Sequence, residues 1–215
     1  MQDAVFQLPA FIDLGATLAF GLTGAVAAIK RGYDIVGVFF LALASGLGGG
    51  LIRDGVMINH QGATPLLTDP RYLETIVVAT LAGALLGRHM RHFHRGIAII
   101  DAVGLGAYAA FGTQKALHAG LAVPAALLVG VINAVGGGLL RDILTREEPL
   151  VFKPGQFYVL TAFAGAVTFV FLTVELEVPA TRAAFTAIAL TFVFRALTIV
   201  FNWRTAAVKA LTGEA

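Results

Sequence analysis

The chain has 215 residues, of which 58% are hydrophobic and only 13% are charged. Its mean hydropathy of +0.83 is far above that of an average soluble domain, so the composition indicates an integral membrane protein. The net charge is +2 and the chain has no Cys, which excludes disulfides and thiolate metal sites.

Long apolar segments follow one another along the whole chain. A helix needs about 20 residues to cross a bilayer, and it satisfies its own backbone hydrogen bonds without water. The apolar segments fall at 8–29, 34–57, 71–87, 96–117, 120–143, 156–174 and 180–201. We therefore predict an all-α integral membrane protein, with a single transmembrane domain over residues 1–215 and seven transmembrane helices.

The basic residues are divided unequally between the two ends of these segments, and no aromatic platform for nucleic acid lies among them. One side collects ten of them: Lys30, Arg31, Arg88, Arg91, Arg95, Arg141, Arg146, Lys153, Arg204 and Lys209. The other side collects four: Arg53, Arg71, Lys115 and Arg182. Because basic loops tend to stay in the cytoplasm, we expect a multi-pass protein of the plasma (inner) membrane, with its N-terminus outside and its C-terminus in the cytoplasm.

The first part of the chain is repeated in the second. The sequence GGGLIRD at 48–54 returns as GGGLLRD at 136–142, and the stretch from Asp13 to Asp54 aligns with that from Asp101 to Asp142 at a constant offset of 88 residues. Each unit holds three predicted helices, so the second unit must enter the membrane from the opposite face. This predicts two inverted repeats, at about 8–87 and 96–174, followed by an extra helix at about 180–201.

Glycine triplets lie in the second predicted helix of each repeat. Three consecutive glycines lower helix propensity by about 1 kcal/mol each, so a pair of matched triplets indicates a site. The helices can kink there and expose carbonyls to an ion along a pore, or the glycines can simply allow two helices to pack closely. The candidate residues are Gly48, Gly49, Gly50, Gly136, Gly137 and Gly138.

Each triplet is followed by an Arg-Asp pair, Arg53 with Asp54 and Arg141 with Asp142. These charges can stand at the mouths of a pore or lock the ends of interrupted helices. In the alternative interpretation, the arginines extend to the lipid headgroups and the aspartates bond locally.

Three further charged residues lie within or beside the apolar segments. Asp13 is near the start of its helix, where we expect it to cap the N-terminus. Asp101 follows five residues without charge and lies deeper, so we expect a functional role or a buried ion pair. Lys115 can extend to the outer surface or face a water-filled interior.

Arg195 lies inside the last predicted helix, and we interpret it as an oligomer contact. The tract from Arg88 to Arg95 contains three His among arginines and no carboxylate, which favours a cytoplasmic loop over a metal site. Ser45 is the one serine and has no His nearby, and no motif for catalysis or phosphate binding occurs. We therefore expect neither an enzyme nor a cofactor.

The doubled signature resembles that of the prokaryotic TRIC (trimeric intracellular cation channel) family. The resemblance rests on Asp13, on FGLTGA at 20–25, on GTQKAL at 112–117 and on both GGGLxRD motifs, and it covers about residues 10–200. It implies a protomer of two inverted three-helix repeats plus a seventh helix, assembled as a homotrimer. Potassium and sodium would pass through a pore in each protomer, between second and fifth helices kinked at the glycine triplets.

Some bacterial relatives of this family are described as glycine transporters, which leaves a second function open. An inverted repeat with interrupted helices suits a transporter as well as a channel. An arginine with Asp13 or Asp101 would supply the donors and acceptors that an amino acid requires. The partners that we expect are a second and third copy of the chain, membrane lipid and small cations, and bound lipid stays an open alternative.

Overall fold

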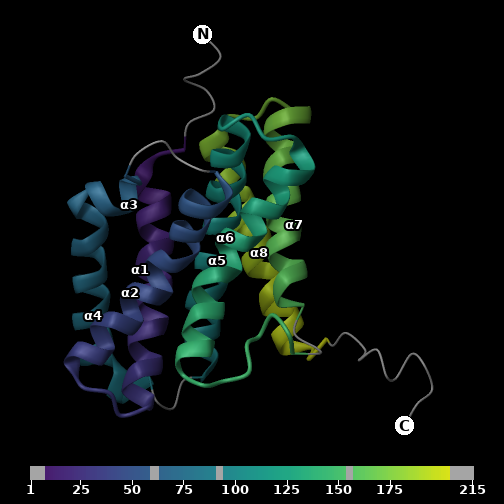
Figure 1. Cartoon of the computed structure of the whole chain (residues 1–215). Coiled ribbons are helices and arrows are strands. Elements are labelled where there is room, and N and C mark those ends of the chain that lie inside the picture. Colours follow the sequence, from purple (N-terminus) through teal and green to yellow (C-terminus); the bar gives the residue numbers. More distant parts are fainter. Residues whose placement is uncertain (1–7, 59–62, 91–93, 154–156, 204–215) are drawn as a thin grey trace, which may run out of the picture.

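The computed structural model describes residues 8–58, 63–90, 94–153 and 157–203, and all regular structure in these ranges is helical (Figure 1). Side chains are not described for residues 86–96. Each predicted apolar segment coincides with a long helix, and only the short α3 is additional. The helices are α1 (Ala10–Lys30), α2 (Ile35–Ile52) continued by the π-helical η1 (Arg53–Met57), α3 (Pro65–Thr68), α4 (Pro70–Met90), α5 (His94–His118), α6 (Val123–Leu144), α7 (Tyr158–Val170) continued by the π-helical η2 (Phe171–Glu175), and α8 (Ala180–Val200).

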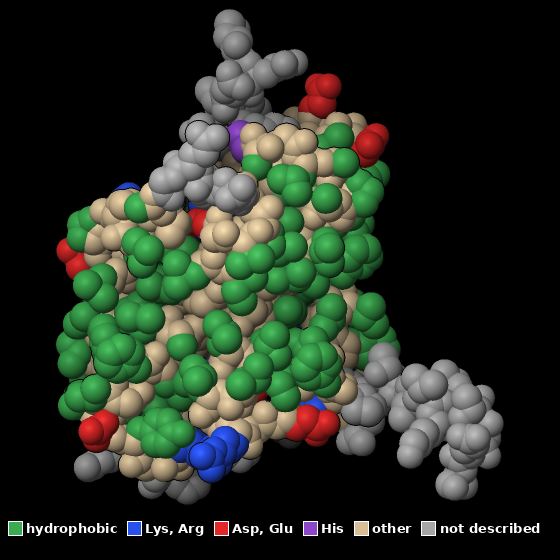
Figure 2. All heavy atoms as spheres, in the orientation of Figure 1, with side chains coloured by type: hydrophobic (Ala, Val, Ile, Leu, Met, Phe, Trp, Pro, Cys, Tyr) green, Lys and Arg blue, Asp and Glu red, His purple; other side chains and the backbone are tan. Residues whose placement is uncertain are grey.

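The outer surface of the bundle is apolar along its length. Large side chains such as Phe40, Leu85 and Phe185 are exposed, and Figure 2 shows hydrophobic side chains over the middle of the molecule with acidic and basic groups toward its two ends. In the part of the chain that the structure describes, six helices are long and apolar enough to span a bilayer. The chain is therefore an all-helical membrane protein, as its composition predicts. The described part of α4 is not among the six, so the count of seven spans stays a prediction.

Helices α1 and α5 end in the same way. Gly32 and Gly120, which are matched by the offset of 88, have φ of +76° and +82°, a left-handed conformation that glycine adopts without strain. The amide of Tyr33 then donates to the carbonyl of Ala28 at 3.1 Å, and the residue after Gly120 bonds back to α5 in the same pattern. This Schellman-type ending turns the chain sharply into α2 and toward α6.

The helices pack as two groups that meet at the centre. The first half of the chain brings together α1, α2 and α4, and the second half brings together α5, α6 and α7 (Figure 1). Across the boundary, α2 packs on α6 and α1 packs on α5, whereas α8 lies against α5 and α7. The contact of α2 with α6 brings the two glycine triplets together.

Candidate functional site

The glycine triplets bring the backbones of the two halves into direct contact. A methyl group on Gly49 would overlap the carbonyl oxygen of Asn133, and one on Gly137 would overlap the carbonyl oxygen of Ser45. A Cβ on Gly136 would lie 3.0 Å from the Cα of Gly49. Backbone therefore packs directly on backbone, in the manner that small residues allow. We call this contact the glycine crossing, formed by residues 48–50 and 136–138.

The outer glycines of each triplet also lack room for a side chain. A Cβ on Gly48 would overlap the side chain of Leu140, and one on Gly50 would come to 2.7 Å from Leu66. The α-helix continues through both triplets, since α2 becomes π-helical only at Arg53 and α6 continues to Leu144. Close packing thus accounts for the glycines as they stand, and their role as pore kinks stays a prediction.

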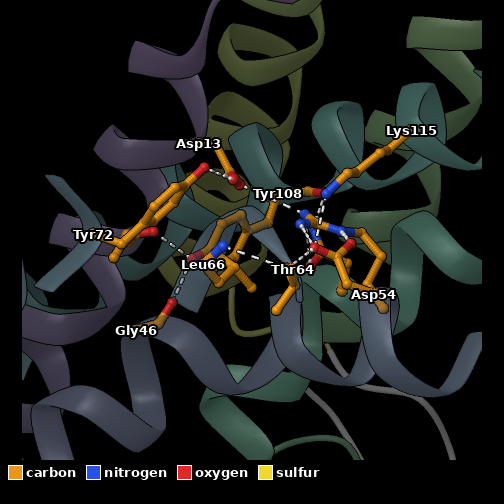
Figure 3. A network of polar contacts seen from close by, with 11 residues as sticks. Asp13, Gly46, Asp54, Thr64, Leu66, Tyr72, Tyr108 and Lys115 are labelled. Carbon is orange, nitrogen blue, oxygen red and sulfur yellow. Dashed lines mark hydrogen bonds and ion pairs between the residues drawn. The ribbon is translucent and has the colours of Figure 1, made fainter. Parts of the chain in front are cut away.

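A buried charge network lies at one end of the glycine crossing (Figure 3). Arg53 has no exposed surface, and its Nε donates to Asp54 at 2.6 Å. Asp54 also accepts from the hydroxyl of Thr64 at 2.6 Å and from the Nζ of Lys115 at 2.7 Å. Arg53 NH1 lies 3.6 Å from Asp13 Oδ1. Helices α1, α2 and α5 and the segment before α3 are thereby joined through charged groups.

Asp13 belongs to this network and is not a helix cap. The residue before α1 is Pro9, and no side-chain hydrogen bond caps the helix. The Asp13 carboxylate is instead 1% exposed and accepts from the hydroxyl of Tyr72 at 2.6 Å. The expectation of capping is wrong, because one turn into the helix this carboxylate faces Arg53 and Tyr72 inside the bundle.

A second buried network stands at the opposite end of the glycine crossing. Arg141 donates from Nε to Asp142 at 3.0 Å and from NH1 to Asp101 at 3.1 Å. The second oxygen of Asp142 accepts from the backbone amide of Leu150 at 3.2 Å. The buried ion pair expected of Asp101 is confirmed. Neither Arg141 nor Arg53 extends to the headgroups, because both guanidinium groups are paired inside the bundle.

Each arginine also bonds across to the other half of the chain. Arg53 NH1 lies 3.4 Å from the side-chain oxygen of Asn133, and the Asn133 amide donates to the carbonyl of Tyr108 at 2.7 Å. On the other side, Arg141 NH1 donates to the hydroxyl of Thr23 at 3.0 Å, and this hydroxyl donates to the carbonyl of Phe20 at 2.8 Å. We call these the first cross-strap (Arg53, Asn133, the carbonyl of Tyr108) and the second cross-strap (Arg141, Thr23, the carbonyl of Phe20).

The two cross-straps end at equivalent positions. Phe20 and Tyr108 are related by the offset of 88 residues, and their rings stack at a centroid distance of 5.4 Å with 8° between their planes. We call Asn133 and Thr23, which stand between each arginine and the carbonyl, the relays. The two relays are not at equivalent positions, because the position that matches Asn133 is Ser45 and the position that matches Thr23 is Phe111. Phe111 lies instead under the guanidinium of Arg53, at 5.3 Å.

Sequence reasoning missed Thr23, Thr64, Tyr72 and Asn133. Asn133 could have been found, because an Asn in a predicted span is costly unless its amide is bonded. Tyr72 and Tyr158 are both buried third-helix residues of the two halves, yet they are 86 residues apart and not 88, since the preceding loops differ in length. An offset taken from the glycine motifs does not align them.

Lys115 and Arg195 both face the interior. The Lys115 side chain is 21% exposed and directed at Asp54 (Figure 3), so it does not extend to the surface. Arg195 is 2% exposed, with its guanidinium carbon 5.0 Å above the ring of Tyr158. The interpretation of Arg195 as an oligomer contact is wrong, because α8 packs this residue against α7. The side chains of the tract from Arg88 to Arg95 lie outside the described part of the structure.

A cavity of about 170 Å³ opens next to the second network. Thr23, Arg141 and Asp142 line it, together with the loop residues Glu147 and Glu148. The two loops around it are tied at the surface, where Arg31 NH2 lies 3.0 Å from Glu147 Oε1. In the described ranges, no three His, Cys, Asp or Glu residues are grouped to hold a metal ion.

Comparison with known proteins gives consistent matches over most of the chain. A family model described as Glycine transporter matches residues 10–88 and 98–174. The chain is 33% identical over 159 residues to a UPF0126 membrane protein of Deinococcus radiodurans, over 73% of this chain and 72% of that protein. It is 30% identical over 186 residues to the UPF0126 inner membrane protein YadS of Escherichia coli K12, over 86% and 88% of the two chains.

A solved structure shares the fold. The TRIC trimeric intracellular cation channel orthologue from Rhodobacter sphaeroides superposes with a TM-score of 0.81 at 30% identity, over 89% of this chain and 96% of that chain. The resemblance to the TRIC family that the doubled signature indicates is therefore confirmed.

Proposed function

Because the chain belongs to the glycine transporter family of UPF0126 membrane proteins and shares its fold with a TRIC channel, we propose that it is a channel for the monovalent cations K⁺ and Na⁺. The proposed path runs inside the protomer, between α2 and α6. The observation that carries the proposal is the pair of buried charge networks, one at each end of a crossing made of glycine backbone.

The arrangement can conduct if α2 and α6 separate at the glycine crossing. Where α2 and α6 meet backbone to backbone, at Gly49 and Gly137, no interlocking side chain has to withdraw, so a small displacement would open a path bounded by backbone carbonyls. Asp54 and Asp142 at the two ends would then face that path and attract cations. In the arrangement described above, the crossing leaves no room even for a methyl group, which corresponds to a closed path.

We further infer that the two halves form an inverted repeat within seven spans. The glycine, arginine and aspartate positions match at one offset, and both halves end their first helix with the same Gly turn. Three spans in each half place the halves in opposite orientations, and α8 adds the seventh. The similarity to the trimeric channel orthologue supports a homotrimer.

Glycine transport is the alternative function, and the mixed charge of the networks favours it. A carboxylate of glycine would suit Arg53 or Arg141, and its ammonium group would suit Asp13 or Asp101. These groups already pair with one another inside the bundle, however, so a transported amino acid must displace existing ion pairs. We therefore place cation conduction first.

A single reconstitution distinguishes the two functions. Purified protein in liposomes is given a K⁺ gradient, and ion flux and uptake of labelled glycine are measured on the same vesicle batch, with protein-free vesicles as the control. We expect K⁺ and Na⁺ flux that needs no glycine. Glycine accumulation without ion flux would reject the channel in favour of the transporter, and the absence of both would reject transport altogether.

A further inference from the structure

At each end of the glycine crossing, one neutral side chain bonds to an arginine of the opposite half, and at the first end the ion pair of Lys115 with Asp54 joins the halves as well. In the first cross-strap, Asn133 of α6 stands between Arg53 of the first half and a carbonyl of α5. In the second, Thr23 of α1 stands between Arg141 of the second half and a carbonyl of the same α1. Both relays are fully buried, with at most 1% exposure.

The relays are poor candidates for holding the helices themselves together. The carbonyls that they reach, those of Phe20 and Tyr108, lie in the interior of α1 and α5, where the helix backbone already supplies a hydrogen-bond donor. Each arginine also keeps its carboxylates when the relay is absent. What each relay adds is a bond between α2 or α6 and the opposite half, which must break before the glycine crossing can widen.

We propose that Asn133 and Thr23 are positioning residues that hold two gates in series, one at each end of the glycine crossing. The path between α2 and α6 opens only when Arg53 has left Asn133 and Arg141 has left Thr23. This inference rests on the proposed path between α2 and α6, but not on which solute uses it.

The gates are unequal in strength. The bond from Arg53 to Asn133 is long, at 3.4 Å, whereas that from Arg141 to Thr23 is 3.0 Å. Hydrogen bonds weaken toward the upper end of this range. The hydrogen bond of the first cross-strap is therefore weaker than that of the second cross-strap, which lies next to the 170 Å³ cavity.

Isosteric variants test the two relays. Thr23→Val removes the hydroxyl and Asn133→Leu removes the amide, each without a change in the number of side-chain heavy atoms. We expect K⁺ flux in liposomes to rise on the order of tenfold for Thr23→Val, as the loss of a bond to a charged group allows. The flux should rise less for Asn133→Leu. In the double variant it should rise by the product of the two factors, because the open probabilities of two independent gates in series multiply. Thr23→Ser keeps the hydroxyl and should restore the wild-type flux.

The matched control is Thr168→Val. Among the described residues, the Thr168 hydroxyl bonds within its own helix alone, to the carbonyl of Ala164 at 2.8 Å, so its removal should leave flux unchanged. Unaltered or lower flux in both relay variants, with wild-type assembly and thermal stability, would overturn the proposal and leave the cross-straps a structural role.

A second measurement does not depend on the transported solute. The chain has no Cys, so Ser45→Cys introduces a single thiol at the fully buried position that touches Gly137. We expect a small charged thiol reagent to modify it faster in the Thr23→Val and Asn133→Leu backgrounds than in wild type. Equal rates would overturn the gates even if ions flow, whereas faster modification without K⁺ flux would uphold the gates and reject the cation channel.

Discussion

Asp54 is the residue on which the first charge network depends. Its carboxylate accepts from Arg53, Lys115 and Thr64 at distances of 3.1 Å or less, and it is fully buried. Two cations in the interior of a membrane protein are costly unless acidic groups face them. Asp54 therefore permits both Arg53 and Lys115 to remain charged where they are.

We predict that Asp54→Asn destabilises the protein by about 3–5 kcal/mol, the usual cost of leaving a buried charge without its partner. Equilibrium unfolding of the purified protein in mild detergent measures it. Asp69→Asn is the control, because Asp69 pairs with Arg71 at 2.6 Å on the surface, where water replaces a lost partner. Equal stability of the two variants would show that the first network does not hold the fold.

The sequence identifies the charged members of the site but not their arrangement. Both Arg-Asp pairs, Asp101 and Lys115 can be selected because a charge in an apolar segment is conspicuous. Neutral partners such as Thr64 and Tyr72 are inconspicuous, since Thr and Tyr are common in such segments. The position of Asp13 near a helix start predicts a cap, because its distance along the chain from Arg53 says nothing about their distance in space.

At the scale of elements, α2 and α6 combine continuous helix with unusually close contact. The overlap that a methyl group would make with the carbonyls of Asn133 and Ser45 means that the two helix axes cannot approach this closely with any other residue at 49 or 137. Hydrophobic length alone predicts where the helices lie, because an apolar run of about 20 residues must be helical in a bilayer. It does not predict that the triplets remain helical, since tertiary contact overrides glycine's low propensity.

We predict that the double variant Gly49→Ala with Gly137→Ala places two methyl groups in the glycine crossing, where they occupy the space that the proposed path between α2 and α6 requires. If the glycines only permit packing, the variant should lose stability, by about 1–3 kcal/mol or more for an overpacked contact, while any folded protein keeps its K⁺ flux. If they shape the path, folded variant protein should lose most of its flux in liposomes at matched protein density.

The control for this variant is Gly15→Ala in α1. A Cβ there meets no atom within 4 Å, and the added helix propensity is worth about 1 kcal/mol, so flux should be unchanged and stability should not fall. Undiminished flux from a properly assembled double variant would remove the glycine crossing from the path.

For the whole molecule, the arrangement of the helices places the loop before α2 and the loop after α6 at one end, where Arg31 meets Glu147. The positive residues of these loops predict that this end is cytoplasmic under the positive-inside rule. The loop between α5 and α6 would then be external.

Two variants, each with a single thiol in the otherwise Cys-free chain, test this predicted topology. In intact cells, Ala122→Cys should react with a membrane-impermeant thiol reagent, and Phe152→Cys should react only after the membrane is permeabilised, since both positions are exposed. The reverse pattern would invert the orientation.

We also predict a homotrimer, from the similarity to the trimeric channel orthologue. Native mass spectrometry in mild detergent should give three copies of the 22.5 kDa chain. Because Arg195 is buried against Tyr158, the contact between protomers must use other residues, and Arg195→Lys should leave the number of copies in the assembly unchanged. A dimer would refute the trimer, and a stable monomer with full K⁺ flux would show that conduction does not require the trimer.

The division of partners around each arginine has a consequence for biogenesis. Arg53 is translated after Asp13 and together with Asp54, so its charge can be neutralised while the ribosome is still making the first half. Arg141 likewise emerges after Asp101 and beside Asp142. Each half can therefore leave the translocon with its arginine already paired, as insertion into lipid requires. Lys115 and Asn133 reach Asp54 and Arg53 only after the second half has been inserted, so the first network is completed only when the two halves meet.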